Sequence, residues 1–175
     1  MDTPGHGKLR HHAFSTLSAP GAFKGLIFVV DSAALSSPSG LTEAATYLHD
    51  VLLLLQKRHT GAKTSKGPVG LPVLIAANKL DLFTALPPQL VKKYLEEEIT
   101  KIRSTRAKGL LDSGIGIEDH GEEREWLGEG GEGSFRFDQM QEAEIEVRIA
   151  GGNVLGEGAD RARVEEWWTW IGENM

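Results

Sequence analysis

Two short apolar runs, at residues 25–31 and 72–77, each end directly in polar residues, and they constrain the fold more than any other feature. Runs of this length favour strands buried on both faces, as in a parallel sheet. Each run is followed by apolar residues at helical spacing, within 42–55 and 88–106. Alternation at 145–149 predicts a third strand, and 160–171 a last helix that buries Trp167 and Trp168. The pattern predicts an α/β fold with a mostly parallel sheet flanked by helices.

Length and composition restrict the domain organisation and the class of protein. The 175 residues are enough for one domain spanning 1–175. Within it the acidic, glycine-rich stretch 108–134 has few apolar side chains, which predicts a mobile insertion. A net charge of −6 argues against direct nucleic-acid binding, and the absence of cysteine excludes disulfides and thiol chemistry. No apolar stretch reaches the roughly 18 residues of a membrane span.

The second apolar run is followed at once by Asn78-Lys79-Leu80-Asp81. Ligands of parallel sheets bind beyond the carboxyl ends of the strands, which makes this turn a candidate site. The carboxylate of Asp81 can accept two hydrogen bonds from the N1–H and the amine of guanine, a donor pair that adenine lacks. The stem of Lys79 can lie across a flat base, and the amide of Asn78 can bind backbone and base together. An ordinary turn after a strand is the alternative interpretation.

A second candidate site lies at Asp2-Thr3-Pro4-Gly5. An Asp-x-x-Gly pair can hold Mg²⁺ through water with the acid and offer the glycine N–H to a terminal phosphate. An N-terminal tail without a ligand is the alternative. The order of the two motifs around a strand–helix–strand unit favours the functional interpretation.

Both motifs resemble those of the small GTPases, and the flanking residues narrow the resemblance. The runs Gly5-His6-Gly7-Lys8-Leu9-Arg10 and Asp81-Leu82-Phe83-Thr84-Ala85 are similar to the beta subunit family of the signal recognition particle receptor. The resemblance implies a subunit that binds GTP and Mg²⁺ and docks the receptor's alpha subunit. The implied location is the cytoplasmic face of the endoplasmic reticulum membrane, where the subunit would serve co-translational protein targeting.

The resemblance also implies roles for single residues. The second switch segment would include Asp2, which contacts Mg²⁺ through water, and Gly5. Guanine would be read by Asn78, Lys79 and Asp81. The loop on the base side would fall near Ala150. His6 stands where related GTPases orient the attacking water, although a histidine there can equally contact a partner. Residues 2–10 are the expected contact with the alpha subunit, because a nucleotide-gated contact must touch a segment that senses the γ-phosphate.

The sequence departs from this family in one respect: it contains no Gly-x-x-x-x-Gly-Lys-[Ser/Thr] phosphate loop. We therefore expect a partial P-loop GTPase-like fold that lacks the first strand, the phosphate loop and the membrane anchor, from an N-terminally truncated chain or a natural short protein. Such a chain is predicted to bind GTP weakly or not at all, which leaves GTPase activity open. The alternatives are another small GTPase, Arf-like or translation-factor-like, and a GTPase-like scaffold without nucleotide.

Overall fold

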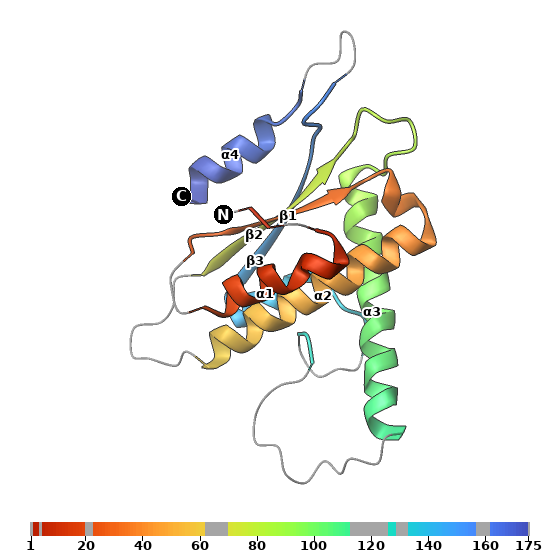
Figure 1. Cartoon of the computed structure of the whole chain (residues 1–175), viewed down its shortest axis with the longest axis vertical. Helices are drawn as coiled ribbons and strands as arrows, with labels where there is room; N and C mark the ends of the chain where they lie inside the picture. The colour runs from red at the N-terminus through yellow and green to blue at the C-terminus, as the bar shows by residue number, and fades with distance from the viewer. Residues whose placement is uncertain are drawn as a thin grey trace.

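The computed structural model describes residues 2–3, 5–19, 23–61, 70–112, 126–128, 133–156 and 162–174 (Figure 1). In chain order its elements are η1 (Gly7–Leu9), α1 (Arg10–Ser18), β1 (Leu26–Asp31), η2 (Ala34–Ser36), α2 (Pro38–Gly61), β2 (Leu71–Asn78), α3 (Pro88–Asp112), η3 (Phe137–Ala143), β3 (Ile145–Gly151) and α4 (Glu165–Asn174).

The described strands form one parallel sheet in the order β1-β2-β3, which confirms the predicted α/β fold. The helix α2 connects β1 to β2, and α3 with η3 connects β2 to β3. The register sets Asp31 opposite Asn78, and Ala77 opposite Gly151. The polar residues that follow the three strands therefore meet at one end of the sheet.

The two faces of the sheet bury separate sets of apolar side chains. One face packs against α2 and α3, with α1 lying on α2, while α4 lies on the opposite face (Figure 1). On β2 the alternation is clear, since Val73 and Ile75 belong to the first cluster and Leu74 to the second. This pattern explains the continuous apolar run, because a central parallel strand is covered on both sides.

Only the central strand matches the expectation of burial on both faces; for β1 that expectation is wrong. The helix α4 contacts β2 and β3, and the β1 side chains Ile27 and Val29 are 39% and 60% exposed. Among the described residues β1 also pairs on one side only, with β2. Within the part of the chain that the structure describes, β1 therefore has one unpaired edge and one apolar face without cover.

The stretch 108–134 also differs from the expectation where it is described. Residues 108–112 continue α3, and Leu127 is fully buried in the core. The side chain of Gln56 fixes this point, since it donates to the Trp126 carbonyl at 2.8 Å and accepts from the Gly128 N–H at 2.9 Å. Residues 126–128 are thus packed against the core. That the stretch is a mobile insertion stays a prediction, and residues 113–125 and 129–132 lie outside the described residues.

Candidate functional site

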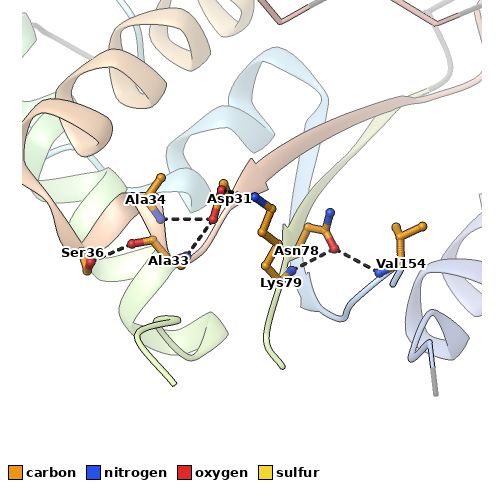
Figure 2. A network of polar contacts seen from close by, with 7 residues as sticks. All are labelled: Asp31, Ala33, Ala34, Ser36, Asn78, Lys79 and Val154. Carbon is orange, nitrogen blue, oxygen red and sulfur yellow. Dashed lines mark hydrogen bonds and ion pairs between the residues drawn. The ribbon is translucent and has the colours of Figure 1, made fainter. Parts of the chain in front are cut away.

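The turn after β2 is fixed by the side chain of Asn78. Its Oδ1 accepts from the Lys79 N–H at 2.8 Å and from the Val154 N–H at 3.2 Å (Figure 2). The first bond shapes the turn, and the second ties it to the loop that follows β3. One amide thus joins the two segments that are expected to surround a base, and its Nδ2 donors have no hydrogen-bond partner among the described residues.

Lys79 adopts a left-handed backbone conformation, with φ of 66°. This region is disfavoured for a residue with a Cβ and persists where the surroundings enforce it. The bond from Asn78 Oδ1 to the Lys79 N–H and a turn bond from the Leu82 N–H to the Lys79 carbonyl, at 3.1 Å, do so here. Strained conformations of this kind cluster at functional sites, which makes the turn a candidate site.

The ammonium of Lys79 reaches back to β1, where its Nζ lies 2.7 Å from Asp31 Oδ2 (Figure 2). The hydrogen bond and the charge of Asp31 raise the pKa of Lys79. Burial raises the pKa of Asp31, but the hydrogen bonds from Lys79 and from the backbone of Ala33 and Ala34, with the lysine charge, outweigh it and lower that pKa. Both groups stay ionised across the neutral range.

The side chain of Asp81 is exposed and accepts no hydrogen bond from the residues that the structure describes. A carboxylate in this state suits a ligand that offers two parallel donors, because both of its oxygens can accept. The position of Asp81 therefore fits guanine recognition.

Two glycines bring the loop after β3 close to the turn. The Gly152 N–H donates to the Ala77 carbonyl at 2.9 Å, and the Leu80 N–H donates to the Gly152 carbonyl at 3.1 Å. A Cβ on Gly151 would clash with Leu80. Ala150 itself lies within β3, with its side chain buried and its carbonyl bonded to Trp167 Nε1 at 3.1 Å. Its contact with a base stays a prediction.

The second motif lies on the other side of β1. Asp2, Gly5 and His6 are exposed, and His6 Nδ1 accepts from the Lys8 N–H at 3.3 Å at the start of η1. Arg10 anchors this segment to α2, because its Nε donates to the Gly5 carbonyl at 3.2 Å and its guanidinium donates to Glu43 at 2.8 Å. The water-positioning role of His6 stays a prediction.

A cavity of about 930 Å³ runs along β1 and reaches the Asp-x-x-Gly motif but not the turn 78–81. Asp2, Thr3 and Gly5 line it, as do Val29 and Asp31. None of the expected base-side residues lines this cavity: Asn78, Lys79, Asp81 and Ala150 lie outside it. The expected phosphate-side residues thus share a space with the carboxylate that holds Lys79, but not with the base-side residues themselves.

The described residues contain no group of three or more histidine or acidic side chains that could hold a metal ion. Asp2 offers one carboxylate, whereas Mg²⁺ takes about six oxygen ligands. These residues therefore do not form a magnesium centre by themselves. No helix in the described ranges is long and apolar enough to cross a membrane.

Sequence reasoning missed Asp31 and Val154 as parts of the site, and it included Arg10 in the expected contact 2–10 without its role as an anchor. The signal for Asp31 was present, because it is the acid that ends the first apolar run and lies beside Asn78 once the strands pair. Val154 contributes through its backbone N–H and Arg10 through contacts distant in sequence. Neither leaves a local pattern.

Comparisons with known proteins agree on one family. The family model of the signal recognition particle receptor beta subunit matches residues 1–145. The chain is 35% identical to a beta subunit of this receptor from Saccharomyces cerevisiae, over 100% of the chain and 65% of that protein. The chain is 27% identical to the beta subunit from Dictyostelium discoideum, over 95% of the chain and 50% of that protein. The chain thus spans between half and two thirds of the curated relatives' length.

Solved structures show the same likeness. A Chaetomium thermophilum receptor SRb with GDP and Mg has a TM-score of 0.81 and 43% identity, over 100% of this chain and 79% of that chain. The SRb-GTP/SRX complex from the same organism has a TM-score of 0.79 and 42% identity, over 99% of this chain and 66% of that chain.

Proposed function

The chain belongs to the beta subunit family of the signal recognition particle receptor, and from this premise we propose that it carries the guanine-reading part of a GTP-binding subunit. The observation that carries the proposal is the turn Asn78-Lys79-Leu80-Asp81 at the carboxyl end of β2, where the Asp81 carboxylate accepts no hydrogen bond from the described residues. The solved relatives with GDP and Mg and with GTP support it.

Three side chains would recognise the base. Asp81 would accept hydrogen bonds from the guanine N1–H and amine, so that adenine would leave its carboxylate unpaired. Asn78 would use its Nδ2, since its Oδ1 already accepts from two backbone N–H groups. The methylene stem of Lys79 would cover one face of the ring.

The phosphates would lie in the cavity beside β1, lined by Asp2 and Gly5. Bound Mg²⁺ would neutralise the charge of the phosphates, with Asp2 as this chain's contact to it through water. Because the sequence has no phosphate loop, the described residues supply only part of the phosphate contacts. We therefore assign this chain no hydrolytic step.

The partner and location follow from the family as part of the same proposal. We propose that the chain docks the receptor's alpha subunit through residues 2–10, at the cytoplasmic face of the endoplasmic reticulum membrane, in co-translational protein targeting. The relative solved as an SRb-GTP/SRX complex supports a nucleotide-dependent partner. The Arg10 anchor on α2 supports this surface, because it gives residues 5–10 a defined shape.

Asp81→Asn tests base recognition directly. In this variant an amide N–H replaces one acceptor oxygen, which removes a bond to the guanine amine and creates one to the C2 carbonyl of xanthine. We expect guanosine monophosphate to bind the wild-type chain in the millimolar range, about −4 kcal/mol, and xanthosine monophosphate to bind Asp81→Asn better than guanosine monophosphate does. Amide shifts in NMR titrations measure both affinities. An unchanged preference in the variant contradicts the assignment, and absence of all nucleotide binding favours the scaffold alternative.

A further inference from the structure

The carboxylate of Asp31 is held on both of its oxygens. Its Oδ1 accepts from the N–H groups of Ala33 and Ala34, at 3.0 and 3.1 Å, and its Oδ2 lies 2.7 Å from Lys79 Nζ (Figure 2). The first two bonds belong to the turn that leads into η2. Because that turn is part of the backbone after β1, the carboxylate offers the lysine a fixed acceptor.

Lys79 is consequently fixed at both ends. Asn78 holds its N–H at 2.8 Å, and Asp31 holds its ammonium. Asp31 and Asn78 face each other in the β1–β2 register, so that the methylene stem of Lys79 spans from β2 to β1 across the carboxyl end of the sheet. A lysine stem without the second anchor would sample many rotamers, and ordering it on binding would cost entropy.

We propose that Asp31 is a positioning residue for guanine recognition, which holds the Lys79 ammonium so that the stem of this lysine forms a preformed wall for the purine ring. This inference rests on the proposed function, since it concerns the same site. Asp31 needs no contact with the nucleotide in this role and acts through Lys79.

The exposure of the pair favours orientation over stability as its role. The side chains of Lys79 and Asp31 are 51% and 36% exposed, and ion pairs this exposed add little to folding. The lowered pKa of Asp31 and the raised pKa of Lys79, together with the nearby charge of Asp81, keep the pair charged near neutral pH. The wall is therefore present whenever a nucleotide could bind.

Asp31→Asn separates the two functions of this carboxylate. The asparagine keeps one oxygen for the Ala33 and Ala34 N–H groups, whereas its amide nitrogen cannot accept from an ammonium. Glu173→Gln is the matched control, because Glu173 forms an ion pair of similar exposure with Arg148, at 3.0 Å, on a different part of the molecule.

The experiment is an NMR titration of the 175-residue chain with guanosine monophosphate and adenosine monophosphate. It compares wild type, Asp31→Asn, Lys79→Ala, the double variant and the control. We expect Asp31→Asn to raise the dissociation constant for guanosine monophosphate about two- to five-fold. In the Lys79→Ala background Asp31→Asn should have no further effect, and the control should match wild type. The Lys79 Cε shift, followed against pH, should report a lower lysine pKa in Asp31→Asn.

The outcomes distinguish this inference from the function on which it rests. An unchanged or tighter affinity in Asp31→Asn overturns the inference, as does an equal loss in both lysine backgrounds. If the wild-type chain in these cases still binds guanosine monophosphate more tightly than adenosine monophosphate, the proposed function is retained without the positioning role of Asp31. If wild type shows no such preference, both the proposed function and the positioning role are overturned.

Discussion

Replacing Gly151 by alanine tests whether close packing between β3 and the base-reading turn sets the shape of the site. A Cβ at this position would clash with Leu80 Cδ1 and lie 2.7 Å from Pro88 Cγ. The leucine side chain can rotate, but the proline ring at the start of α3 is rigid. Overpacking of this kind costs about 1–3 kcal/mol. For a chain of this size that corresponds to a fall in Tm of roughly 2–12 °C.

The same substitution should disturb the site more than the fold. The Leu80 N–H donates to the Gly152 carbonyl at 3.1 Å. A displacement of Leu80 would disturb this hydrogen bond and would also move the neighbouring residues Lys79 and Asp81. We therefore expect weaker binding of guanosine monophosphate at temperatures well below Tm, where the variant is still folded. Thermal unfolding followed by circular dichroism and an NMR titration at low temperature measure the two effects separately.

A second substitution identifies the cause. Gly151→Ala with Leu80→Ala removes the clashing methyl groups, so that the two changes should couple by about 0.5 kcal/mol or more. Gly172→Ala is the control. Apart from its chain neighbours and the backbone of its own helix, no atom of the described residues lies within 4 Å of its added Cβ, and in α4 alanine favours the helix by up to about 1 kcal/mol. Strictly additive effects of Gly151→Ala and Leu80→Ala would assign the cost to Pro88 instead of Leu80, whereas an unchanged Tm in Gly151→Ala would refute the packing argument.

Three further predictions concern the rest of the molecule. Burial raises the pKa of Asp50, but the hydrogen bonds from His49 and Arg106, with their charges, outweigh this effect and lower that pKa. The lowered pKa stabilises the folded state above the unfolded pKa of about 3.9. This stability is lost as the pH falls through the folded pKa. Asp50→Asn should accordingly reduce the drop in urea midpoint between pH 6 and pH 3, and an unchanged drop contradicts this. Trp167→Phe removes the hydrogen bond from Trp167 Nε1 to the Ala150 carbonyl and should cost about 0.5–1.5 kcal/mol in urea unfolding; a loss below the measurement error counts against that bond. Calorimetry should show weak or no binding of GTP to the 175-residue chain, and submicromolar affinity would contradict the partial phosphate site.

The sheet and its long helices could be predicted because their signals are local. The continuous run of β2 reflects cover on both faces, and the apolar spacing of α2 and α3 reflects one buried face each. Helix boundaries were less predictable. The first turn of α2 begins at Pro38, four residues before Thr42, and Ser37 Oγ accepts from the Gly40 N–H at 3.2 Å as its cap. In this turn only Leu41 packs against the core, and it is only partly buried, so the turn has no periodic signal.

The last helix shows a second limit of periodicity. Trp167 and Trp170 are buried, at 9% and 2% exposure, whereas Trp168 is 65% exposed, contrary to the prediction that Trp168 faces inward. Spacing along a helix defines its faces, but which face meets the sheet depends on where the helix begins. Because α4 begins at Glu165 and not near residue 160, the sequence pattern did not determine that choice.

The candidate site was predictable in its residue types but not in its geometry. The turn 78–81 has the composition of a guanine site, and that is a local property. Lys79 has a left-handed conformation and pairs with Asp31, a residue 48 positions away in the sequence. This geometry depends on β1 lying beside β2. Contacts of this kind follow from strand register, which a single sequence does not specify.

The two halves of the site are stabilised in different ways, and this difference has a consequence for binding. The base side is fixed by strand register and by hydrogen bonds of Asn78 and Asp31 within the described fold. The phosphate side, at Asp2 and Gly5, borders the cavity along the unpaired edge of β1. A polypeptide segment that paired with this edge would cover Val29 and also enter the space beside Asp2. Phosphate binding and stability of β1 would then depend on the same contact, whereas base recognition would not.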